Sequence, residues 1–194
     1  MANSKRAQSG KSPTQPRGDA YVEPTRVSQG LDRVREAARG DARLCFTNLL
    51  HHITEQLLSE AYYALNRRAV AGVDGMTWAE YGDGLEPRLQ DLHARVHRGG
   101  YRAQPSLRTY IAKDDGRKRP LGIATLEDKI VQQAVVLVLQ AIYEQDFLGF
   151  SYGFRPKRSQ HNALDAMWVA LMQRKINWVL DADISSFFDR LSHE

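Results

Sequence analysis

The sequence LRTYIAKDDGRKRPLGI, at 107–123, contains two short runs of β-prone residues on either side of an Asp-Asp-Gly turn signal at 114–116. The pattern predicts strands at 107–112 and 118–123, joined as an antiparallel hairpin. Four cations, beginning with Lys113, crowd the turn. Two interpretations follow: an arm that grips a polyanion such as a triphosphate, or a charged hairpin that binds nothing.

Helical patterns flank the hairpin on both sides. Apolar residues recur at intervals of three and four over 126–146, which predicts one helix there. The same spacing over 44–65 predicts one long amphipathic helix or two joined ones. A Thr-x-x-Glu capping box at 77–80 starts a further helix, and the Gly-Gly pair at 99–100 ends it.

The C-terminal part is predicted to contain a loop at 147–159, a helix at 161–173 and a strand at 176–184. Side chains alternate along a strand, so Asp181 and Asp183 share one face of it. The opposite, core-facing side is formed by Trp178, Leu180, Ala182 and Ile184. The two aspartates are either exposed strand residues or oxygen ligands suited to Mg²⁺.

Charge is unevenly distributed along the 194 residues, whose net charge is +4. Residues 1–30 are rich in Ser, Gln, Pro, Gly and Lys and nearly lack large apolar groups, which predicts a disordered basic tail. Between Arg95 and Arg119 there are eight Lys or Arg residues against two Asp. A phosphate-binding surface needs such clustering, and a solvated basic face explains it equally well.

Several classes of protein are disfavoured by the sequence. No apolar run approaches the ~20 residues needed to span a bilayer. The first 19 residues lack the apolar segment of a secretory signal. The single cysteine, Cys45, excludes an internal disulfide. We therefore expect a cytoplasmic protein that does not enter a membrane.

Four sequence blocks follow one another in a characteristic order between residues 46 and 194: GVDG (72–75), GRKRPLGI (116–123) with EDKIVQQAV (127–135), YGFRPKRSQHNAL (152–164) and DADISSFFD (181–189). In this combination the chain resembles the N-terminal part of a group II intron reverse transcriptase/maturase. One block alone is modest evidence, whereas four in order are specific.

The resemblance implies an α+β, mainly helical fold. After the tail at 1–30, the N-terminal helical extension and fingers would occupy 31–100. Fingers with the basic hairpin and helices would follow at 101–175. The start of a palm domain, with its first strand, would lie at 176–194.

The resemblance also implies an RNA-directed DNA polymerase that works by two-metal nucleotidyl transfer. The primer 3′-hydroxyl would attack the α-phosphate of a dNTP, and pyrophosphate would leave. Asp183 matches the first aspartate that binds catalytic Mg²⁺, and the backbone carbonyl of Ile184 would be a further ligand. Phe188 matches the aromatic residue beneath the sugar that excludes a ribonucleotide 2′-hydroxyl.

Basic residues would make the remaining contacts. Lys113 and Arg119 match fingers residues that grip the incoming triphosphate. Contacts with the RNA, as template or intron, would come from Arg117, Lys118, Arg155, Lys157 and Arg158.

The family's second metal-binding motif, an aromatic residue followed by x-Asp-Asp, does not occur in these 194 residues. We therefore expect that this polypeptide alone does not polymerise. A non-catalytic RNA-binding module that assists intron splicing is the alternative, and a degenerate remnant without activity is a third.

Overall fold

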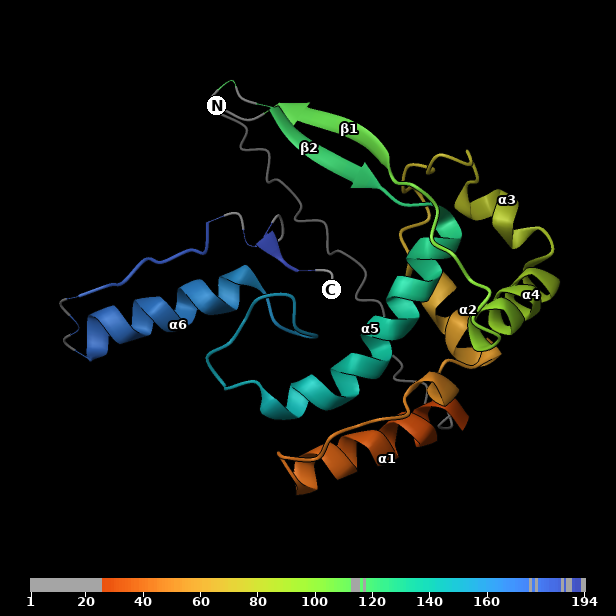
Figure 1. The fold of residues 1–194 in the computed structure, drawn as a ribbon. Coiled ribbons are helices and arrows are strands. Elements are labelled where there is room, and N and C mark those ends of the chain that lie inside the picture. Colours follow the sequence, from red (N-terminus) through yellow and green to blue (C-terminus); the bar gives the residue numbers. More distant parts are fainter. Residues whose placement is uncertain are drawn as a thin grey trace, which may run out of the picture.

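A computed structural model describes residues 26–112, 116, 118–174, 176, 178–185, 187 and 190–192. Within this part of the chain, α1 (Arg26–Gly40) and α2 (Glu55–Ala64) pack against the long helix α5 (Leu126–Asp146), and α4 (Leu85–His97) packs on α2 (Figure 1). No helix in these residues is both long and apolar enough to cross a bilayer.

Helix α5 is the centre of the core. Thr125 caps its N-terminus, because its side-chain oxygen accepts a hydrogen bond from the backbone N–H of Asp128. Its bounds are those predicted from the apolar spacing. The buried apolar side chains of α5 meet those of α2 and α4, and a fully buried Leu or Ile contributes roughly 1.5–3 kcal/mol. The main contributors are Leu57, Leu58, Leu92, Ile130, Ala134 and Val138.

Helix α1 corrects the boundary of the predicted tail. It begins at Arg26, so residues 26–30 are helical, whereas residues 1–25 lie outside the described part. Leu31, Val34 and Ala38 are buried and recur every three or four residues along the helix. The polar composition of the preceding residues concealed this stripe, which becomes stable only by packing on α5.

The helix expected over 44–65 is shorter in the structure. A 3-10 turn, η1 (Leu50–His52), precedes α2, and the side chain of Thr54 caps α2 by accepting from the Leu57 N–H. Residues 44–49 are irregular. The cap therefore places the start of the helix about ten residues later than apolar spacing alone predicts.

The capping box of Thr77 and Glu80 is confirmed, and it starts the short helix α3 (Trp78–Gly82). Gly84 then adopts the left-handed conformation, with φ of +86°, and separates α3 from α4. The sequence had indicated one helix to Gly99-Gly100, which the structure divides in two.

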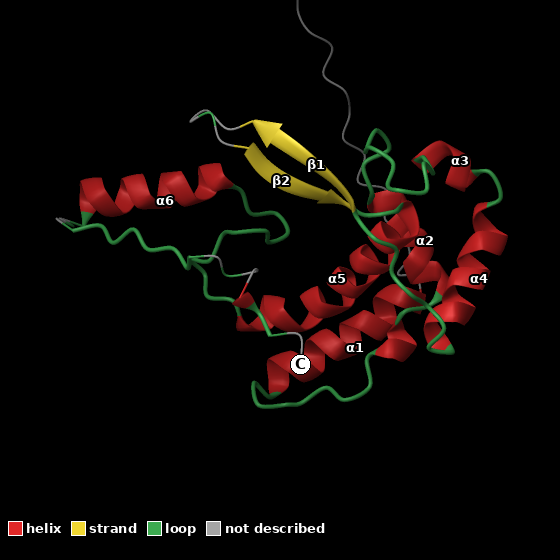
Figure 2. Cartoon of the chain, turned by 45° about the horizontal axis from the view of Figure 1, so that its top comes forward, coloured by secondary structure: helices red, strands yellow, loops and turns green. Residues whose placement is uncertain are grey.

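The predicted hairpin is confirmed at its predicted bounds. Strand β1 (Leu107–Ala112) pairs antiparallel with β2 (Lys118–Ile123), from Leu107 opposite Ile123 to Ala112 opposite Lys118. Figure 2 shows this two-stranded ribbon projecting away from the helices. The hairpin is the only sheet among the described residues.

The prediction of a strand at 176–184 is wrong for the residues that the structure describes. Helix α6 (Gln160–Gln173) matches expectation, but the segment after it is irregular and runs back past α6 (Figure 1). Trp178 and Leu180, expected to face the core, are each 90% exposed. A strand requires a neighbouring backbone to pair with, and no described strand lies beside this segment.

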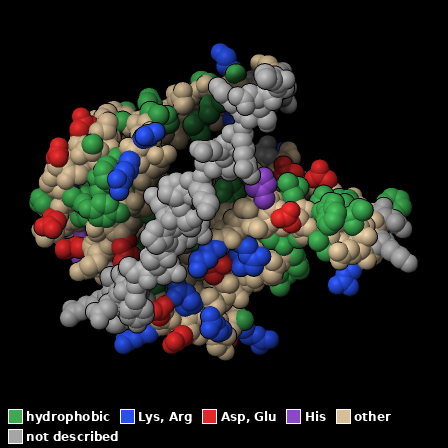
Figure 3. All heavy atoms as spheres, turned by 180° about the vertical axis from the view of Figure 1, so that it is seen from behind, with side chains coloured by type: hydrophobic (Ala, Val, Ile, Leu, Met, Phe, Trp, Pro, Cys, Tyr) green, Lys and Arg blue, Asp and Glu red, His purple; other side chains and the backbone are tan. Residues whose placement is uncertain are grey.

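Helix α6 likewise buries none of its described residues, although both of its ends are capped. Its apolar side chains, with Trp168 and Met172 among them, are exposed. Hydrophobic side chains gather over α6 on the rear face of the molecule (Figure 3). Among the described residues, the packed core is therefore formed by α1 to α5 and Ile53, without α6.

The GVDG block contains a glycine required by close packing. A Cβ built on Gly72 lies 2.6 Å from Thr125 Cα and 2.8 Å from the Ala124 carbonyl oxygen. Lys129 Nζ holds the same loop by donating to the Val70 carbonyl oxygen at 2.7 Å. The loop thus rests directly on the junction between β2 and α5.

We expect Gly72→Ala to lower the free energy of unfolding by about 1–3 kcal/mol, because backbone atoms must shift to admit the methyl group. Gly149→Ala is the matched control, since nothing lies within 4 Å of its Cβ. Urea denaturation measures both changes. Equal stability of the two variants would contradict the close contact.

Candidate nucleic-acid interface

The base of the hairpin is held by a charged contact between α4 and α5. Arg95 Nη2 donates to both carboxylate oxygens of Glu127, at 2.9 Å each. Its Nε donates to Asp91 Oδ2 at 2.7 Å, and the Tyr81 hydroxyl donates to Glu127 Oε1 at 3.3 Å. Arg95 thus links Asp91 on its own helix to Glu127 at the start of α5, and these charge-assisted hydrogen bonds hold α4 against α5.

A buried carboxylate completes this base. Asp128, 3% exposed, accepts hydrogen bonds from the Thr125 hydroxyl at 2.7 Å and from the Gln104 N–H at 3.1 Å. The Tyr101 hydroxyl donates to its other oxygen. Buried charge is tolerated only when it is hydrogen-bonded, and these three donors meet that condition. The chain entering β1 and the helix following β2 are thereby tied to one side chain.

Residues 107–123 form what we call the hairpin arm. Cross-strand partners share a face, so Arg108, Tyr110 and Lys118 lie on one face and Arg119 lies on the other. All four side chains are exposed, and none of the three cations forms an ion pair with another described residue. One face therefore combines two free cations with an aromatic ring, as nucleic-acid surfaces do.

Tyr110 and Arg108 were not among the site residues assigned from the sequence. Two features indicate them: side chains alternate between the two faces along β1, and the register of the hairpin places Tyr110 opposite Pro120. Lys113 and Arg117, both assigned from the sequence, lie outside the described residues.

The loop at 147–159 contains three cations that were predicted to contact RNA, and the structure gives them different surroundings. The Arg155 side chain is 7% exposed and donates to Glu144, at 3.1 Å from Nη2. Its Nη1 donates to the carbonyl oxygens of Leu148 and Ser151, both at 2.9 Å. These hydrogen bonds from the Arg155 side chain stabilise the loop. We therefore do not propose Arg155 as an RNA contact.

The other two cations of this loop differ from Arg155. Lys157 is exposed and has a φ of +59°, a strained conformation for a residue with a side chain. Arg158 is half-buried, donates from Nη1 to the Gly149 carbonyl oxygen at 2.8 Å and lies 5.4 Å from the Tyr152 ring centroid. Lys157 is thus freer than Arg158 to meet an anion.

The predicted metal residues do not form a cluster among the described residues. Asp183 is exposed, and its Oδ1 accepts a hydrogen bond from the N–H of Ile184 at 2.9 Å. No group of three or more His, Cys, Asp or Glu side chains there lies close enough to hold a metal. One carboxylate does not fit a two-metal Mg²⁺ centre. Phe188 lies outside the described residues.

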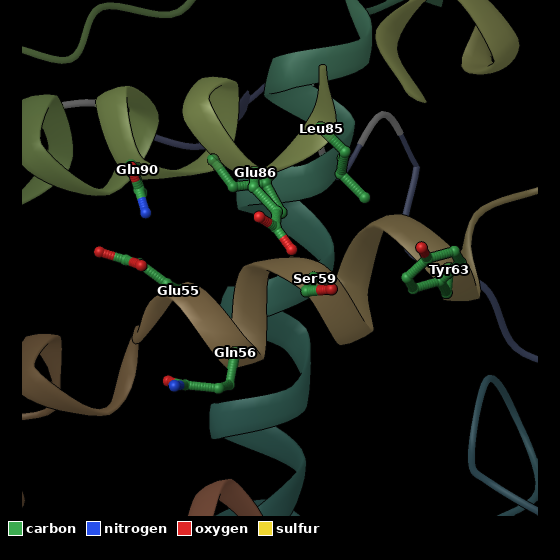
Figure 4. Close-up of a pocket in the computed structure, with 8 residues that line it drawn as sticks. Glu55, Gln56, Ser59, Tyr63, Leu85, Glu86 and Gln90 are labelled. Atoms are coloured by element: carbon green, nitrogen blue, oxygen red, sulfur yellow. The ribbon is translucent and has the colours of Figure 1, made fainter. Parts of the chain in front are cut away.

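A pocket between α2 and α4 is chemically unlike the arm. Its volume is about 250 Å³, and Figure 4 shows Glu86 of α4 extending toward Ser59 of α2. Glu55 also lines it and lies 3.9 Å from His93. Two carboxylates repel phosphate, so this pocket is not part of a nucleic-acid surface.

Two tyrosines of the hairpin base make stability depend on pH. Burial, strengthened by Glu127 beside Tyr81 and by Asp128 beside Tyr101, raises the pKa of both phenols above the ordinary 10.0. The folded state therefore favours the neutral phenols. Their contribution to stability is complete below pH 10 and is lost as the pH rises above it.

We expect the free energy of unfolding to fall as the pH rises above 10, with Tyr101→Phe showing a shallower fall. Denaturant melts at a series of pH values measure the slope. Ultraviolet absorbance of phenolate reports ionisation directly. If Tyr101→Phe removes part of the phenolate absorbance change near pH 10, Tyr101 ionises there in the folded protein, which would contradict the burial described above.

Comparison with known proteins identifies relatives of the chain. Residues 111–194 match the family model described as reverse transcriptase (RNA-dependent DNA polymerase). The chain is 37% identical over 174 residues to protein YkfC of Escherichia coli, covering 86% of this chain and 46% of YkfC. It is 33% identical over 169 residues to the group II intron-encoded protein LtrA of Lactococcus lactis, covering 84% of this chain and 27% of LtrA.

A shorter similarity links the chain to a third protein. It is 41% identical over 90 residues to an uncharacterized 91 kDa protein in the cob intron of Schizosaccharomyces pombe, covering 46% of this chain and 11% of that protein. The chain spans less than half the length of each of these relatives.

Proposed function

The chain belongs to the group II intron reverse transcriptase/maturase family, and from this premise we propose that it binds RNA through the hairpin arm. The observation that carries the proposal is the arm's exposed face with Arg108, Tyr110 and Lys118. None of these side chains supports the core. Their charge and ring are therefore available to phosphates and bases.

The anchoring of the arm supports the same role. Glu127 and Asp128 stand at the start of α5 and connect to both chain segments at the hairpin base. An arm that is fixed at its base loses less conformational freedom when it binds, so more of the contact energy contributes to affinity. Arg119, on the opposite face, would meet a second phosphate group, which in a polymerase is that of the incoming dNTP.

Polymerisation itself would require residues beyond those described. Asp183 and the carbonyl of Ile184 supply too few ligands for two Mg²⁺ ions, and the 194 residues contain no aromatic-x-Asp-Asp sequence. We therefore propose that copying of RNA into DNA, with primer and dNTP, is an activity to which these residues contribute only in part.

A non-catalytic role in splicing is the second candidate. The described residues favour it because they combine an exposed cationic arm with no cluster of acidic ligands. Binding of structured intron RNA through phosphate and shape needs only the arm. RNA binding is common to both candidates, whereas primer extension distinguishes them.

We expect a labelled, blunt-ended and fully paired RNA duplex to bind tightly at about 50 mM salt and much more weakly at about 200 mM. Arg108→Gln with Lys118→Gln should reduce the slope of log affinity against log salt by about one for each lost contact. Arg43→Gln, a cation outside the arm, is the control. Fluorescence anisotropy measures binding, and a slope that the double variant leaves unchanged would argue against the arm.

In primer extension with Mg²⁺, an RNA template and dNTPs, we expect the 194-residue chain to yield no product above background. The physical reason is the missing carboxylates. The Asp183→Ala variant is the control for contaminating polymerase. Robust synthesis that this variant abolishes would overturn the proposed dependence on further acidic residues.

A further inference from the structure

A second hollow lies apart from the arm, between α1 and residues 46–52. Its volume is about 470 Å³, within the range of roughly 300–1,000 Å³ usual for ligand sites. Leu49 and Ile53 meet Val138 near the middle of α5, about 20 Å along the helix from the end where the arm begins. Figures 1 and 2 show α1 and the hairpin on opposite sides of the helical assembly.

Aromatic rings form one wall of this hollow. The His51 and His52 ring centroids are 3.9 Å apart, and Phe46 lies beside them. Burial, followed by the neighbouring His51, lowers the pKa of His52, so its ring is uncharged at neutral pH. Uncharged planar rings are the surfaces on which unpaired bases stack.

Gly30 of α1 keeps the hollow open. A Cβ built on Gly30 lies 3.5 Å from His52 Nδ1, which is an ordinary contact distance. Alanine therefore fits at this position, whereas a longer side chain would fill the space beside the ring. Glycine in a helix costs about 1 kcal/mol relative to alanine, so helix stability does not account for its presence.

Polar groups on the rim of the hollow are suited to contact the phosphate and the base edge of a nucleotide. Arg33 is exposed, and its neighbour Asp32 already pairs with Arg35. No ion pair between described residues involves Arg33, which leaves its guanidinium available to a phosphate. Asn48 is exposed and offers an amide donor and acceptor to the edge of a base.

We propose that this pocket binds one unpaired nucleotide of RNA, with the base against the His51 and His52 rings and the phosphate at Arg33. The proposal rests on the proposed function, because it adds a selective contact to the phosphate contacts of the arm. Bases inside an A-form helix are stacked on their neighbours, so their faces are not available to an aromatic ring. The pocket therefore selects RNA that carries a bulged or looped-out base.

The test compares a blunt-ended, fully paired RNA duplex with the same duplex carrying one bulged adenosine. We expect the chain to bind the bulged RNA roughly tenfold more tightly in an anisotropy titration, the effect of stacking one base. Gly30→Leu should remove this preference, and Gly30→Ala should retain it. The fully paired duplex should bind all three proteins equally.

Circular dichroism checks that Gly30→Leu is folded, and His51→Ala with Asn48→Ala provides a second variant that leaves α1 untouched. Equal affinity of the two RNAs for the unaltered chain, or a preference that survives in both variants, would overturn the pocket. Salt-sensitive binding of both duplexes would still support the arm in that case. If neither RNA binds, the pocket and the proposed function are rejected together.

Discussion

The carboxylate of Asp128 is the constraint from which the arrangement of the molecule follows. It lies at the start of the central helix and accepts hydrogen bonds from Thr125, Tyr101 and the backbone of Gln104. A buried charge without these donors would be strongly destabilising, so the segment at 101–104 and the start of α5 must meet at this side chain. Arg95 and the neighbouring Glu127 add a second link, from α4. The arm begins at this convergence, and its direction is set there.

Cationic residues of the same type therefore have two different roles in this protein. Arg155 and Arg95 are cations that hold the structure together, since each donates to a nearby glutamate. No ion pair between described residues involves Arg108, Lys118 or Arg119. Charge alone does not separate the two groups. The presence of a carboxylate within reach makes an arginine structural, and its absence leaves the charge for a partner.

The sequence predictions were accurate where an element depends on interactions between nearby residues, and inaccurate where it depends on packing between distant ones. The hairpin and α5 were predicted at their observed bounds, because turn residues, capping residues and apolar spacing act within a few positions. The helical extension was expected to begin at residue 31, and the earlier start of α1 at Arg26 was not predicted because packing on α5 stabilises its short apolar stripe. The segment 176–184 has the composition of a strand, but pairing with a neighbour decides whether a strand forms.

The sequence by itself determined the family, through four ordered blocks, and the local elements that carry the cations of the arm. Only the tertiary structure decided which of those cations are free, because Glu144 reaches Arg155 across eleven positions. It also decided that Gly72 must approach Thr125 closely and that His52 faces Gly30. These contacts join residues distant in the sequence, and no local pattern encodes a distance between two elements before they pack.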